Sequence, residues 1–152
     1  MSEAKYAIQN FELLDLLELI PKVRSLKEEG YRLVQACATR SADGTITVIY
    51  SFDLDHVLYN FKVIVPENLE MQSITDSYWS AFIYENEMRD LFGIRFHHLA
   101  LDYGGHFFKV AMPRPWNPEV VQEEEKAPEA APEERRLTRE EMLEIMGSEV
   151  EE

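Results

Sequence analysis

The order of apolar and polar residues divides the chain into a helical first segment and several strand-like segments. Between residues 11 and 29, apolar side chains recur every three or four positions, as they do on one face of a helix. Pro21 interrupts this pattern, so we expect either two short helices or one kinked helix. Gly30 then stands where a glycine commonly ends a helix.

Three further segments have the composition of β-strands. Residues 31–39 and 45–54 flank Asp43-Gly44, a pair that suits a type I′ turn, and together they predict a hairpin. Residues 57–65 carry apolar side chains at alternate positions and predict a third strand. We expect a small, mainly antiparallel sheet with helices packed on it, which is an α+β fold.

A second helix is predicted to begin near Ser73 and to end at Gly93. Ser73 and Asp76 have the spacing of a capping box, and a glycine suits the end of a helix. The helix would carry an apolar stripe made of Ile74, Tyr78, Ala81, Tyr84, Met88 and Leu91. Residues 94–96 and 106–111 are predicted to form two more short strands.

Composition and charge limit the possible classes of function. Hydrophobic residues make up 45% of the 152 residues, which is enough for a core. The formal net charge of −14 argues against electrostatic binding of nucleic acid or of an anionic membrane surface. No secretory signal and no apolar run of membrane-spanning length is present, so we expect a cytoplasmic protein. Partner proteins would have to hold it at a membrane.

Charge and proline content change abruptly after residue 118. Residues 119–152 hold 13 acids and 4 bases, a net charge of −9, and residues 1–118 have a net charge of −5. We interpret residues 1–118 as one domain, 119–136 as a Glu/Ala/Pro-rich linker, and 137–152 as a short amphipathic helix and tail. The apolar residues of this last segment are Leu137, Met142, Leu143, Ile145 and Met146. They predict a helix that docks on a partner or on the domain itself, with a solvated tail as the alternative.

The densest group of charges lies at the end of the second predicted helix. Its residues are Glu85, Glu87, Arg89 and Asp90, followed by Leu91, Phe92, Gly93 and Ile94. On a helix, Glu85 and Arg89 share a face as a favourable pair, whereas Glu87 and Asp90 share another face as like charges. An arginine from another subunit would relieve that repulsion. An exposed ion network, a subunit interface and an acid–base site all remain open, and the adjoining apolar residues favour the interface.

The remaining reactive residues indicate no complete catalytic site. Cys37 is the only cysteine, which excludes an internal disulfide and a cysteine-held metal cluster, and its place in a strand favours packing. His97 and His98 would point to opposite faces of an extended segment, so a metal site would need His106 brought close by a loop. His56 is interpreted as a turn residue. Nucleophile elbows and phosphate-binding glycine loops are absent from the sequence.

The motif resembles the signature of a known family. Its residues Glu85 to Ile94, preceded by Ser73-Ile74-Thr75-Asp76, are similar to E-R-E-x-x-D-[LM]-[FY]-G-[IV] of the 30-kDa subunit family of respiratory complex I, the NADH dehydrogenase of respiratory membranes. Asn86 replaces the usual arginine of that signature. The resemblance covers roughly residues 10–115. Downstream, Leu99 to Lys109 departs from the loop of the respiratory members and is more similar to short subunits of Ech-type membrane-bound [NiFe] hydrogenases.

The resemblance implies a hydrophilic accessory subunit without catalytic or cofactor-binding residues of its own. It would lie on the cytoplasmic side of the cell membrane and pack against the large (49-kDa-like) subunit. The [NiFe] centre and iron–sulfur clusters would belong to that subunit, to an iron–sulfur small subunit and to a ferredoxin-like subunit. The complex would couple ferredoxin-dependent hydrogen evolution to ion translocation in a membrane arm. Alternatives are the equivalent subunit of an NADH/quinone oxidoreductase, a stand-alone acidic hydrolase and a free adaptor.

Overall fold

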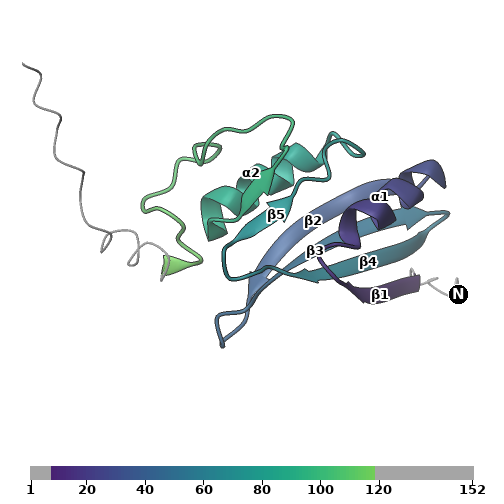
Figure 1. The fold of residues 1–152 in the computed structure, drawn as a ribbon, viewed down its shortest axis with the longest axis horizontal. Coiled ribbons are helices and arrows are strands. Elements are labelled where there is room, and N and C mark those ends of the chain that lie inside the picture. The colour runs from purple at the N-terminus through teal and green to yellow at the C-terminus, as the bar shows by residue number, and fades with distance from the viewer. Residues whose placement is uncertain (1–7, 119–152) are drawn as a thin grey trace, which may run out of the picture.

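Figure 1 shows the computed structural model of the protein, which describes residues 8–118. Its centre is a four-stranded sheet with the strand order β1-β4-β3-β2. The strands are β1 (Ile8–Leu14), β2 (Arg32–Arg40), β3 (Ile46–Leu54) and β4 (Val57–Ile64). β3 pairs with β2 and β4 in antiparallel fashion, whereas β1 runs parallel to β4. The α+β fold with a mainly antiparallel sheet is confirmed. The predicted linker and docking segment, residues 119–152, lie outside the described residues.

The prediction of two short helices or one kinked helix over residues 11–29 is wrong. Residues 8–14 form strand β1, and only α1 (Leu19–Glu28) is helical. Pro21 lies in the first turn of α1, where a backbone N–H has no partner within the helix, so it causes no kink. The end of α1 agrees with the prediction. Gly30 has a φ of +91° and donates to the carbonyl of Lys27, and Tyr31 N donates to Leu26 O.

The type I′ turn lies between β3 and β4, and not between β2 and β3 where the sequence predicted it. The predicted type I′ turn at Asp43-Gly44 is wrong, because only Gly44 has a positive φ and its N–H donates to the carbonyl of Ser41. Asp43 accepts the N–H of Thr45 at 3.0 Å, and this bond lowers the pKa of Asp43. Between β3 and β4 the turn residues Asp55 and His56 both have positive φ, as a type I′ turn requires, which confirms the turn role predicted for His56.

Both helices lie on the same face of the sheet. Lys22 of α1 lies over the ring of Phe61, and the hydroxyl of Tyr50 donates to Glu85 of α2 (Ala81–Phe92). Phe61 and Tyr50 are directly opposite each other in β4 and β3, so they share a face. The buried core lies between this face and the helices. Within residues 8–118 neither helix covers the opposite face, which exposes Phe11, Leu13 and Ile64.

The second helix starts later than the sequence suggested. It begins at Ala81, with Ser80 as N-cap, and the predicted capping box of Ser73 and Asp76 does not form. Ser73 instead follows β5 (Glu70–Gln72), and its hydroxyl accepts the N–H of Thr75 at 3.1 Å. The residues between β5 and α2 form turns, in which Tyr78 N donates to Ile74 O.

After α2 the chain forms one short strand and then a long loop. β6 (Arg95–His97) pairs with β5 in parallel and confirms the strand predicted at residues 94–96 to within a residue. The strand predicted at residues 106–111 is wrong, because that segment is a loop of turns and bends. Gly104 and Gly105 both have positive φ, and the N–H of Phe108 donates to a side chain of α2 rather than to a neighbouring strand.

Candidate functional site

The motif predicted from the sequence forms the last two thirds of α2 and the two residues after it. Its buried members are Glu85, Asp90, Phe92, Gly93 and Ile94. Its half-buried members are Glu87, Arg89 and Leu91. The alternative of an exposed ion network at a helix end is therefore wrong. Two of the three acids are enclosed by the protein itself.

Glu85 is held in a closed polar pocket and is fully buried. Its carboxylate accepts hydrogen bonds from the Ser73 hydroxyl at 2.5 Å, from Ile74 N at 3.0 Å and from the Tyr50 hydroxyl at 3.3 Å. Burial raises its pKa to about 7, although the three hydrogen bonds act in the opposite direction. The pKa of Tyr50 is raised by burial and by the Glu85 charge. Glu85 therefore joins β3, the β5–α2 segment and α2.

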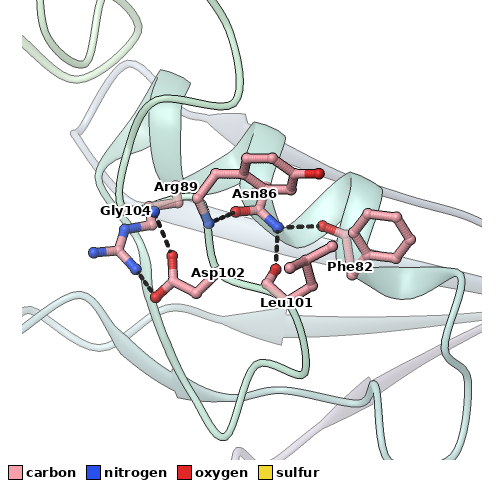
Figure 2. A network of polar contacts seen from close by, with 7 residues as sticks. Phe82, Asn86, Arg89, Leu101, Asp102 and Gly104 are labelled. Carbon is pink, nitrogen blue, oxygen red and sulfur yellow. Dashed lines mark hydrogen bonds and ion pairs between the residues drawn. The ribbon is translucent and has the colours of Figure 1, made fainter.

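The predicted pairing of Glu85 with Arg89 is wrong, because Arg89 pairs with Asp102 of the loop after β6. Asp102 also accepts the N–H of Gly104 at 2.7 Å and so shapes the turn that follows. Figure 2 shows this ion pair beside a second set of contacts on α2. The arginine therefore fastens the loop to the helix.

Asn86 is the residue whose role the sequence did not reveal. Its side chain is fully buried and donates to the carbonyls of Phe82 at 2.7 Å and Leu101 at 2.8 Å. Its side-chain oxygen accepts the N–H of Tyr103 at 2.9 Å. In Figure 2 the amide lies between the helix and the loop, and its three bonds join them. Asn86 is also the position that departs from the family signature, and this departure was the available signal.

Asp90, Trp116 and Asn117 form the hydrogen bonds at the C-terminal end of α2. One carboxylate oxygen of Asp90 accepts Phe108 N at 2.6 Å, and the other has no hydrogen-bond partner within the described residues. The carbonyls of Leu91 and Phe92 accept Trp116 N and the side-chain amide of Asn117. These bonds satisfy carbonyls that a helix end leaves without partners.

Gly93 allows the backbone to leave the helix sharply. It has a φ of +81°, and an added Cβ would lie 2.7 Å from a side-chain carbon of Arg114. The positive φ favours glycine here, and any larger residue would also have to displace the Arg114 side chain. Ile94 follows and is fully buried in the core.

Glu87 is the motif acid whose side chain has no partner among residues 8–118. It is half-buried, and within residues 8–118 it makes no hydrogen bond or ion pair. Its charge contributes, after burial, to raising the pKa of Cys37 on β2, so the thiol stays protonated at neutral pH. The expectation that a cation of another subunit lies beside Glu87 remains a prediction.

The histidines form no metal site among the described residues. His97 lies 3.5 Å from Glu70 of β5, and no group of three potential ligands from His, Cys, Asp and Glu is found between residues 8 and 118. In the same part of the protein, every helix is too short or too polar to cross a bilayer. The motif thus carries positioning contacts within the domain and no nucleophile–base pair.

The comparisons with known proteins agree with this structural role. A family model described as "Respiratory-chain NADH dehydrogenase, 30 Kd subunit" matches residues 12–102. The protein belongs to this family. The 30-kDa subunit is a structural subunit of an oxidoreductase complex and is not catalytic by itself. The match includes the whole motif and ends at Asp102, the partner of Arg89.

A solved structure shares the fold of this 30-kDa-type subunit. It is one subunit in the structure of the membrane-bound sulfane sulfur reductase (MBS), an archaeal respiratory membrane complex. The TM-score is 0.64 at 16% sequence identity, and the alignment covers 89% of this protein and 88% of the other. At this identity the similarity concerns the fold. No curated protein matches the sequence.

Proposed function

We propose that the protein is the hydrophilic, non-catalytic accessory subunit of an Ech-type membrane-bound [NiFe] hydrogenase, in which it packs against the large subunit. The [NiFe] centre and the iron–sulfur clusters would belong to partner subunits, including the ferredoxin-like one. The protein would reach the cytoplasmic side of the membrane only through those partners. Family membership supports a role in an oxidoreductase complex, and the fold shared with a subunit of the MBS complex supports a membrane-bound one.

This proposal rests mainly on one observation: the buried acids of the motif form hydrogen bonds within their own domain. Glu85 accepts hydrogen bonds from hydroxyls and a backbone N–H of its own domain, and Asp90 accepts a backbone N–H of the loop after β6. Such contacts position a helix end and a loop. Chemistry on ferredoxin, protons or hydrogen would then require cofactors in neighbouring subunits.

The hydrogenase branch is favoured by the segment Leu99 to Lys109. It is mostly apolar and glycine-rich, with Asp102 as its only acid, and that acid is already paired with Arg89. These residues differ from the loop of the respiratory members, and this difference supports the hydrogenase branch. The equivalent subunit of an NADH/quinone oxidoreductase is the second candidate, because it belongs to the same family.

Purification of the assembled complex tests the proposal. The protein, tagged at its own locus, would be isolated in mild detergent, and its partners would be identified by mass spectrometry with nickel and iron analysis. We expect a large subunit with nickel-binding cysteines, nickel in the complex, and hydrogen evolution from reduced ferredoxin. A nickel-free complex that oxidises NADH with quinone would establish the second candidate. Recovery of the protein without any partner would contradict both.

Glu87 gives a sharper test within the same complex. Because it is the motif acid without a partner among residues 8–118, Glu87→Ala is expected to reduce the recovery of the large subunit. Glu28→Ala, at an exposed position on α1, is the matched control and should leave recovery unchanged. A Glu87→Ala complex that assembles fully but evolves no hydrogen would assign Glu87 to the chemistry instead.

A further inference from the structure

The loop after β6 carries an exposed aromatic surface. We call it the loop surface and define it as Leu101, Tyr103, Phe107, Phe108 and Met112. The ring of Phe107 contacts those of Tyr103 and Phe108, with centroids 5.1 and 5.0 Å away. All but the half-buried Phe107 are exposed to solvent, by 39% to 48%. Aromatic residues and methionine gathered in this way are typical of protein-binding surfaces.

The loop surface is held in place by hydrogen bonds to α2. Asn86 holds the backbone at Leu101 and Tyr103, and Asp90 holds the backbone of Phe108. Residues 105–113 line a hollow of about 610 Å³ next to these rings. A surface fixed by hydrogen bonds to a helix loses little conformational entropy when it binds, so it is suited to docking.

A basic residue lies in the loop that carries this surface. Of the three bases in residues 95–118, Arg95 is paired with Glu70 of β5, whereas Lys109 lies beside Phe108 in the loop itself. The single acid of this range, Asp102, is paired with Arg89 of α2. Lys109 is exposed and forms no ion pair within the described residues. An apolar ligand bordered by acidic side chains would match this surface.

We propose that residues 137–152 of the same protein dock on the loop surface. Six acids and one base lie in this segment, and its apolar residues Leu143, Ile145 and Met146 adjoin Glu141 and Glu144. Its charge and its apolar residues are thus complementary to the loop surface. Docking of residues 137–152 would be intramolecular, whichever complex the protein enters.

The position of residue 118 and the length of the connection allow residues 137–152 to reach the loop surface. Trp116 and Asn117 are hydrogen-bonded to the end of α2, the same helix whose Asp90 holds Phe108, so the described residues end near the loop surface. A connection of 18 residues, from 119 to 136, would span about 25 Å as a Gly-rich coil, and its prolines and acidic residues extend it further. A tether of this length gives an effective concentration of roughly millimolar, so even a weak contact would be populated.

Site-specific photo-cross-linking of the full-length protein tests the proposal. A photoreactive phenylalanine analogue is placed at position 108, and in a control protein at position 11, which is exposed on the uncovered face of the sheet. Irradiation of dilute protein followed by peptide mapping should join position 108 to residues 137–152 and leave position 11 unlinked. Replacing Leu143, Ile145 and Met146 together by serine should abolish the cross-link.

Charge dependence gives the second readout. Lys109→Glu should weaken the cross-link from position 108, and so should raising the salt from about 0.01 M to about 1 M, which shortens the screening length from about 30 Å to about 3 Å. Mixing isotopically light and heavy protein separates a contact within one molecule from one between copies. Cross-links only between copies, only to another protein of the complex, or none at all from position 108 would each overturn the proposal.

Discussion

Replacing Glu85 by glutamine separates the effect of its buried charge from the effect of its hydrogen bonds. Glutamine has nearly the same size and shape as glutamate. Its carbonyl can accept from Ile74 N and the Tyr50 hydroxyl, and its amide can donate to the Ser73 oxygen. The substitution therefore imitates the protonated carboxyl and removes only the ionised form.

The expected size of the effect follows from the pKa. Glu85 has a pKa of about 7 in the folded protein against 4.5 for an ordinary glutamate. Each pKa unit corresponds to about 1.4 kcal/mol, so ionising this carboxylate in the folded state destabilises the protein by roughly 3 kcal/mol. Within the described residues its hydrogen-bond partners are two hydroxyls and a backbone N–H, none of which carries a compensating charge.

The direction of the pH effect follows because the folded pKa is raised. The folded state binds the proton more tightly than the unfolded state, so this stability is fully present below about pH 4.5. It is lost as the pH rises through about 7. Relative to wild type, Glu85→Gln should be nearly neutral at about pH 4. It should be more stable by roughly 3 kcal/mol at about pH 8.

Urea unfolding of the full-length protein at these two pH values, followed by circular dichroism, measures the difference directly. Glu28→Gln is the control, because Glu28 is exposed at the end of α1 and its substitution should have the same small effect at both pH values. If Glu85→Gln changes the free energy of unfolding equally at both pH values, the carboxyl is not titrating in this range. The account of the buried carboxylate would then be refuted.

Three further predictions concern the end of α2 and its loop. Gly93→Ala should destabilise the fold by about 1–3 kcal/mol, and by more than Gly30→Ala. Gly30 has a similar φ, but a Cβ added there would have no atom within 4 Å. Equal losses of stability in urea unfolding would exclude a steric cost at Gly93. Asn86→Ala should reduce the free energy of unfolding by about 2 kcal/mol and speed amide hydrogen exchange in residues 101–103 more than in the sheet. An equal increase of exchange in the loop and in the sheet would show that Asn86 does not hold this loop specifically. Arg89→Ala should cost less than about 1 kcal/mol, because Asp102 remains partly exposed, and a larger loss would mean that the pair is effectively buried.

The strands of the sheet show how far local pattern alone determined the fold. Residues 31–39 and 45–54 were recognisable from their composition and the turn between them, and residues 57–65 from alternating apolar positions. Each pairs with its neighbour in sequence. β1 was not recognisable. Its leucines and phenylalanine also fit a helical period, and its pairing partner β4 lies about 50 residues later in the sequence. A short apolar segment of this kind takes its conformation from the strand it meets.

The start of α2 and the loop after β6 were misjudged for a related reason. Ser73 has the sequence pattern of a helix cap, but a buried carboxylate twelve residues later takes its hydroxyl. Residues 106–111 have strand-like composition, but Asp90 binds the N–H of Phe108 in place of a neighbouring strand. In both segments a long-range hydrogen bond to α2 outweighs a weak local preference.

The sequence by itself determined the strands β2, β3 and β4, the place of the motif and the family to which the protein belongs, because these depend on residues close together in sequence. The tertiary structure decided what each charge of the motif does. It buries Glu85 with Tyr50 and Ser73, gives Arg89 to Asp102, and leaves Glu87 without a partner in the described residues. Those assignments depend on which distant groups the sheet and loop bring to α2, and on the free energy of removing a charge from water.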